Sequence, residues 1–145
     1  MEMWKNAVLW LLVLFVFQVS LSLTSEKSTL ECMQELNIDE SALSAIYDEK
    51  FHFVLGNEDT FKFLECCLRK IPFFDKDGEF DRAFAIEQLG EGVRLVANGK
   101  IGDDKVPELS ERWFDLCKGK KGEALPKRMA AYHNCVMTEL ETYIK

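Results

Sequence analysis

The chain has 145 residues, with 25 acidic and 18 basic side chains and a net charge of −7 at neutral pH. This length suits one domain with a single hydrophobic core. Because binding to phosphates needs a basic face, the acidic composition argues against nucleic acid as a partner, and it disfavours an acidic membrane surface for the same reason.

The chain begins with the features of a secretory signal peptide. One basic residue precedes an apolar run at 7–17, and small residues follow it. A run of about a dozen residues is too short to cross a bilayer, which takes about twenty. We therefore expect residues 1–22 to be removed, by cleavage after Ser22 or Thr24, and residues 23–145 to form a secreted domain that does not insert into membranes.

Hydrophobic residues at three- and four-residue spacings predict three helices in the first half of that domain. The first spans residues 25–37. The second is capped by Asp39 and fades near Phe53, and the third begins at Glu58 and ends at Pro72. The side chains expected to face inward are those of Leu30, Met33, Leu36, Leu43, Ile46, Tyr47, Phe61, Leu64 and Leu68.

The second half begins with a turn at 75–78, which contains aspartates and a glycine. A fourth helix is predicted from the Asp81 cap through Val96, although two glycines weaken its middle. Pro107 opens a fifth helix that contains Leu109, Trp113, Phe114 and Leu116. Pro126 opens a sixth, which carries Met129, Tyr132, Val136 and Leu140 at inward spacings and extends toward Ile144. Six helices and no alternating strand pattern predict an all-α domain.

Five cysteines in a secreted chain indicate a disulfide framework. Cys32 lies on the first predicted helix, Cys66 and Cys67 on the third, Cys117 at the end of the fifth and Cys135 within the sixth. Five cysteines can be paired into two disulfides, with one cysteine left over, in many ways. The residues by themselves therefore leave the pairing open.

The segment that follows the two adjacent cysteines has a distinctive order of residue types. The run 66–70 reads CCLRK, and the run 73–81 reads FFDKDGEFD, so an aliphatic and basic stretch is followed by an acidic turn with glycine. This order resembles the insect odorant-binding proteins of the pheromone and general odorant-binding type. The similarity covers nearly the whole chain after the signal peptide.

The resemblance also indicates which bonds are present. The family's full pattern has six cysteines, and two of those positions hold Lys62 and Pro126 here. Both members of one bridge are missing together, as in the reduced-cysteine ("minus-C") branch of the family. The resemblance implies the bonds Cys32–Cys66 and Cys117–Cys135 and leaves Cys67 as a free thiol. Cys67 departs from both family patterns, so whether it or Cys66 bonds Cys32 stays open. We expect Cys67 to be buried, the alternative being an intermolecular disulfide.

The resemblance implies a compact six-helix, disulfide-stapled domain that encloses an apolar cavity. Aromatic residues are numerous for so small a bundle, which supports a cavity, although a solid core would also use them. The tyrosine hydroxyls and the indole would be its few polar groups. The residues expected to line the cavity are Tyr47, Phe51, Phe74, Phe84, Leu89, Trp113, Phe114, Tyr132 and Val136.

Metal and catalytic chemistry find little support in the sequence. If Gly78 takes the sixth position of a calcium loop, Phe73 and Phe84 fall where carboxylates are needed, so the segment is predicted to be a turn. The two histidines after the signal peptide, His52 and His133, lie in no catalytic or metal-binding motif. We expect no enzyme activity, no metal and no cofactor. A role for His133 as a pH switch on ligand release is weighed against simple packing.

The sequence is thus interpreted as a secreted, extracellular carrier of small hydrophobic ligands such as odorants, pheromones or lipid-like molecules. One alternative keeps the fold and places the carrier in haemolymph, a reproductive secretion or venom. Another is a secreted signalling or effector protein that acts through protein contacts. A receptor or a second copy of the chain is a further expected partner.

Overall fold

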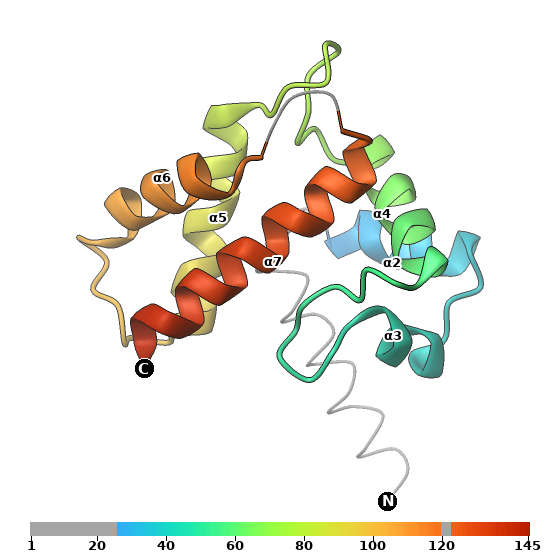
Figure 1. The fold of residues 1–145 in the computed structure, drawn as a ribbon, viewed down its shortest axis with the longest axis horizontal. Coiled ribbons are helices and arrows are strands. Elements are labelled where there is room, and N and C mark those ends of the chain that lie inside the picture. The colour runs from blue at the N-terminus through green and yellow to red at the C-terminus, as the bar shows by residue number, and fades with distance from the viewer. Residues whose placement is uncertain (1–25, 120–122) are drawn as a thin grey trace, which may run out of the picture.

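The computed structural model describes residues 26–119 and 123–145, which form an all-α domain of six helices (Figure 1). This confirms the predicted fold class, and the described part contains no strand longer than an isolated bridge. The predicted signal peptide lies outside the described residues. The helices are α2 (Glu26–Glu35), α3 (Glu40–Ile46), α4 (Glu58–Lys70), α5 (Arg82–Ala97), α6 (Val106–Cys117) and α7 (Leu125–Ile144).

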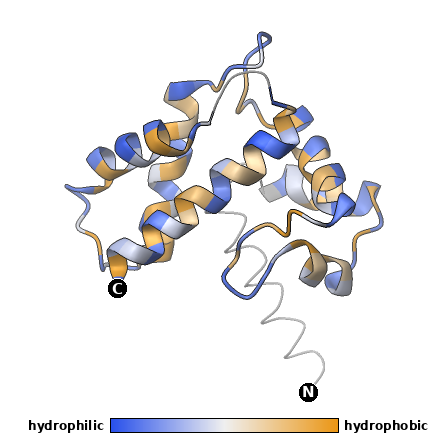
Figure 2. Ribbon diagram, in the orientation of Figure 1, coloured by the Kyte–Doolittle hydropathy of each residue, from blue (hydrophilic) through white to orange (hydrophobic). Residues whose placement is uncertain are grey.

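The long helix α7 crosses the domain between two groups of helices. Figure 1 shows α5 and α6 on one side of it and α2, α3 and α4 on the other. Helix α7 packs against both α4 and α6, while α5 packs on α6 and α2 on α4. Every helix turns apolar residues toward this core (Figure 2). The largest side chains with almost no exposed surface are Trp113, Phe63, Phe73, Phe114, Ile46, Leu64, Met129 and Leu140.

Side-chain caps begin three of the helices where the sequence places them. Asp39 accepts a hydrogen bond from the backbone N–H of Ala42 at 2.8 Å, and Asp81 accepts one from Phe84 at 3.1 Å. Asn57 caps α4 in the same way. Each cap satisfies an N–H that the first helical turn leaves unpaired, which is worth about 1 kcal/mol. The predicted caps at Asp39 and Asp81 are therefore confirmed.

The second helix is shorter than predicted. It ends at Ile46, and Tyr47 instead forms an antiparallel bridge with Phe53. Asp48 accepts backbone hydrogen bonds from Lys50 and His52, so a tight turn replaces the helical continuation. Leu36 also differs from the expectation, because α2 stops one residue earlier and leaves this side chain 36% exposed.

Two disulfides tie the helices together. Cys32–Cys66 joins α2 to α4, and Cys117–Cys135 joins α6 to α7, which is the pairing that the resemblance implied. Loops of 34 and 18 residues are closed, and in the chain-entropy model each closure contributes about 3 to 4 kcal/mol. Cys67 is a free, fully buried cysteine, and burial raises the pKa of its thiol to about 12.

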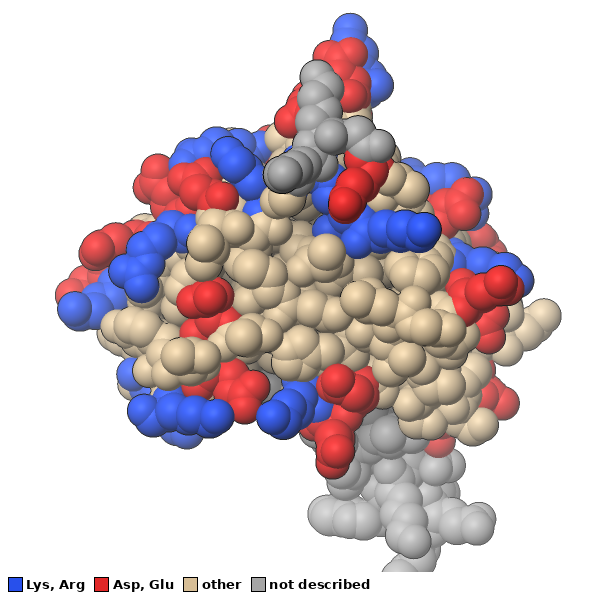
Figure 3. Space-filling model, viewed as in Figure 1, with Lys and Arg blue, Asp and Glu red and all other residues tan. Residues whose placement is uncertain are grey.

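Charged residues surround the domain rather than cover it evenly. Figure 3 shows Lys, Arg, Asp and Glu gathered mainly at the edges of the face across which α7 runs. The exposed residues of α7 include Ala131, Thr138 and Thr142. Within the described residues, no helix combines the length and apolar character needed to cross a bilayer.

The burial of Cys67 predicts a thiol that reagents reach only after unfolding. The native protein should react with less than one tenth of an equivalent of a thiol reagent at pH 8, because the thiolate is scarce and shielded. Unfolding in guanidinium without reductant should release one equivalent. Mass spectrometry of the labelled protein would check both values, and fast labelling of the native protein would contradict the buried position.

Candidate ligand-binding site

An apolar pocket of about 260 Å³ opens beside the C-terminal half of α7. Its walls come from three segments: the turn that follows α3, the end of α5, and α7. Met137 and Leu140 are core residues of α7, so the floor of the pocket is continuous with the hydrophobic core. The lining residues are Lys50, Phe51, Val96, Met137, Leu140, Glu141 and Ile144.

The charged side chains among the described residues that line this pocket are Lys50 and Glu141, and both are partly exposed. The ammonium of Lys50 lies 3.8 Å from a carboxylate oxygen of Glu141, and Lys145 lies 3.5 Å from the same oxygen. These side chains are substantially exposed, and pairs of that kind contribute little to stability. The rim is therefore polar and loosely held, while the interior offers apolar surface. That combination suits a small apolar ligand.

The wall at Lys50 and Phe51 is part of a turn that the chain uses twice. In both copies an aspartate carboxylate, of Asp48 or Asp75, accepts the backbone N–H groups two and four residues later. Both copies also place an aromatic bridge across the turn, Tyr47 with Phe53 and Phe74 with Phe80. The segments read YDEKFHF at 47–53 and FDKDGEF at 74–80.

The two turns differ at their fourth residue after the first aromatic. Gly78 occupies this position in the second turn with φ of +78°, which suits glycine. Phe51 occupies it in the first with φ of +64°. A bulky residue in this left-handed region is rare, and the conformation costs on the order of 1–2 kcal/mol. The backbone of the pocket turn is thus strained, and its strained residue points a phenyl group at the pocket.

Buried His133 of α7 holds this strained residue. Its Nε2 lies 2.8 Å from the carbonyl oxygen of Phe51, and because a carbonyl only accepts, Nε2 carries the proton. Burial lowers the pKa of His133 to about 4, against a smaller opposing effect of this hydrogen bond. His52 lowers the pKa further and Asp48 raises it. The ring is therefore neutral at physiological pH.

Aromatic rings fill the core on both sides of His133. Tyr47 and His133 each contact Phe53, with both pairs of ring centroids 4.6 Å apart. One residue earlier on α7, Tyr132 lies 5.0 Å from Phe80. Phe80 is in turn stacked on Phe74 at 4.3 Å and covered by the Arg128 guanidinium at 4.8 Å. Burial raises the pKa of the Tyr132 hydroxyl, so this group stays protonated.

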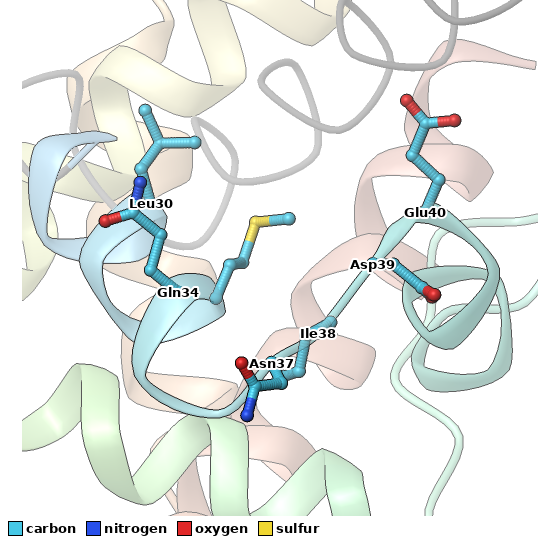
Figure 4. Close-up of a pocket in the computed structure, with 7 residues that line it drawn as sticks. Leu30, Gln34, Asn37, Ile38, Asp39 and Glu40 are labelled. Carbon is cyan, nitrogen blue, oxygen red and sulfur yellow. The ribbon is translucent and has the colours of Figure 1, made fainter.

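Two further pockets are less suited to an apolar ligand. One, of about 570 Å³, is lined by described residues between Leu30 and Glu40, among them the polar Gln34, Asn37, Asp39 and Glu40 (Figure 4). The other, of about 410 Å³, lies between α4 and the start of α7 and includes Pro126. Charged Glu65 and Arg69 form part of its wall.

The structure places one of the nine predicted lining residues, Phe51, in the pocket beside α7. Tyr47, Phe74 and Phe84 are half-buried at the edge of the core. The other five, Leu89, Trp113, Phe114, Tyr132 and Val136, are buried within it. Contact of these eight with a ligand stays a prediction, as does a fully enclosed cavity, because the pockets described here are open to solvent.

Sequence reasoning did not assign the α5 and α7 residues of the pocket to a site. Leu140 was expected at an inward spacing, Val96 and Ile144 were expected only within the predicted helices, and Met137 was not singled out. The spacing of positions 137, 140, 141 and 144 along one helix was the available signal.

An all-α, disulfide-stapled domain with an apolar pocket defines a small helical ligand-binding protein. The chain matches the PBP/GOBP family over residues 17–139, and it therefore belongs to this family of insect pheromone- and odorant-binding proteins. Members of the family are binding proteins rather than enzymes. No match was found among curated proteins or among solved structures.

The lowered pKa of His133 predicts a loss of stability in acid. Below its ordinary value of about 6.5 the unfolded chain takes up a proton that the folded protein does not accept until about pH 4. The free energy of unfolding should therefore fall by about 3 kcal/mol more over this window than it would without His133. Denaturant titrations at pH 7 and pH 4 would measure the fall.

Two variants make this prediction specific. His133→Gln retains a donor for the Phe51 carbonyl, and it should show a smaller fall than the wild-type protein over the same window. His52→Gln changes the other histidine of the domain, which is not fully buried, and should keep most of the wild-type fall. Equal falls in the wild-type protein and His133→Gln would show that this histidine is not the cause.

Proposed function

We propose that this protein is a secreted carrier that reversibly binds and solubilises small hydrophobic molecules, such as odorants, pheromones or lipid-like compounds. The observation that carries the proposal is the apolar pocket beside α7, whose floor is formed by core residues and whose charges lie at the rim. Membership of a family of odorant-binding proteins supports it.

Binding would rest on the burial of apolar area. A ligand gains about 25 cal/mol for each Å² of apolar surface removed from water, less the cost of ordering it. Five of the seven lining residues, Phe51, Val96, Met137, Leu140 and Ile144, offer apolar surface, and the flexible side chain of Met137 adapts to different shapes. The site thus favours compact apolar ligands of varied shape.

Buried polar atoms in the helical core support a capacity for a few orienting hydrogen bonds. Among the described residues, the side-chain oxygens of Gln88, Ser110 and Tyr132 are buried and have no hydrogen-bond partner. Buried groups of this kind normally have one. They are available to a ligand or to water that reaches the interior, one on each of α5, α6 and α7.

A fluorescent apolar probe tests the proposal. A phenylnaphthylamine should bind the purified protein with a Kd in the micromolar range and be displaced by small apolar alcohols or esters. Ile144→Trp should weaken this binding at least tenfold, because the indole fills the pocket. Leu116→Trp introduces the same indole at a residue that is 62% exposed on α6, and it should bind like the wild-type protein.

The wild-type protein tests whether the probe binds, and the two tryptophan variants test where on the molecule it binds. Failure of the wild-type protein to bind the probe at micromolar concentration would overturn the carrier function. Equal affinity of the two tryptophan variants would show that the ligand occupies another part of the molecule.

A further inference from the structure

We propose that residues 48–52 form a movable strap over the apolar pocket, and that a ligand enters and leaves when this strap lifts away from α7. The inference rests on the proposed function, and it adds the route and the control of access to the same site. The strap supplies two of the seven lining residues, Lys50 and Phe51, so its displacement opens the pocket from one side.

Among the described residues, few hydrogen bonds and ion pairs link the strap to α7. The imidazole Nε2 of His133 donates to the Phe51 carbonyl at 2.8 Å, and His52 Nε2 lies 3.1 Å from the Thr138 hydroxyl. Thr138 donates its own proton to the carbonyl of Asn134, so it accepts from His52. Lys50 and Glu141 complete the set with an exposed ion pair at 3.8 Å. Water can replace most of these partners when the strap lifts.

Firm anchors lie at the base of the strap. The backbone N–H of Phe53 donates to the side-chain oxygen of Asn134 at 2.7 Å, and the Asn134 amide donates back to the Phe53 carbonyl at 3.1 Å. Phe53 is buried and bridges to Tyr47. Inside the strap, the Asp48 carboxylate accepts the N–H groups of Lys50 and His52, which flank Phe51, and these bonds hold the strained backbone in its closed conformation. The base therefore acts as a hinge, and the conformation of residues 48–52 changes when the strap lifts.

The strain at Phe51 makes the closed position less stable than the turn could be. The second copy of the same turn meets the left-handed position with Gly78, which adopts it without a steric cost. Phe51 adopts it at a cost, and its carbonyl needs the His133 donor to be held there. Lifting the strap relieves this strain. Because the closed strap is strained and held by few hydrogen bonds, its local opening costs much less free energy than unfolding of the core.

Two matched pairs of variants test the strap. Phe51→Gly and Phe51→Ala both remove the phenyl group, but only glycine relieves the strained backbone. The strap of Phe51→Gly should therefore spend more time closed than the strap of Phe51→Ala. Thr138→Ala removes the hydroxyl that accepts a hydrogen bond from His52. Thr142→Ala makes the same change one turn further along α7, where the hydroxyl donates to the carbonyl of Thr138 and, among the described residues, makes no bond to the strap. Far-UV circular dichroism would confirm that all four variants are folded.

Stopped-flow mixing with the fluorescent probe gives the first measurement. Association and dissociation rates should both be about fivefold lower in Phe51→Gly than in Phe51→Ala. They should both be about threefold higher in Thr138→Ala than in Thr142→Ala, with the Kd changed by less than twofold. Equal rates within each pair, in proteins that bind the probe, would overturn the strap while leaving the carrier function standing.

The imidazole proton of His133 gives a second measurement that needs no ligand. This proton is covered by the strap, so its exchange with water, followed by nitrogen-15 NMR, reports the lifting directly. The exchange should differ between the variants in the same order as the probe rates. Absence of probe binding to the wild-type protein would overturn the proposed function and the strap's role in ligand access, whatever the exchange showed.

Discussion

The C-terminal helix α7 organises the domain by donating hydrogen bonds to turns on both of its sides. Arg128, which is 4% exposed, donates to the carbonyls of Gly78 and Lys118, and His133 donates to that of Phe51. Gly78 and Phe51 occupy the same position in two copies of one turn. A buried donor without a partner is costly, so each of these bonds fixes a turn against the helix. The position of α7 thereby sets where the chain leaves α3 and where it enters α5.

Most of the helices could be predicted because their signals are local. Apolar residues three and four apart identified all six, and Asp39 and Asp81 identified two starts. The prediction failed at 47–53, where apolar spacing also suits a helix. There the backbone is held by Asn134, which is 81 residues away from Phe53 in the chain, and no local pattern contains that partner. The disulfide pairing likewise depended on the family resemblance.

The site was less predictable than the fold for a related reason. A helical face shows which residues turn inward, but it does not show where the packing leaves space, so Leu140 was expected only to be buried, and it now lines the pocket. Phe51 was expected in a pocket on grounds of aromaticity, and its strained backbone was not foreseen. The repeated pattern of an aromatic residue, an aspartate and a second aromatic six positions after the first was visible in the sequence. Comparison of its two copies would have singled out Phe51 against Gly78.

The choice between the neighbouring cysteines has a consequence for the rotation of α4 about its axis. Successive residues of a helix point about 100° apart, so a bond from Cys32 to Cys67 would require α4 to turn by roughly that angle. Phe63, Leu64 and Thr60, which are now buried, would then rotate together away from the positions they fill. The Cys32–Cys66 bond is therefore more than a link between two helices. It also fixes which face of α4 packs into the core.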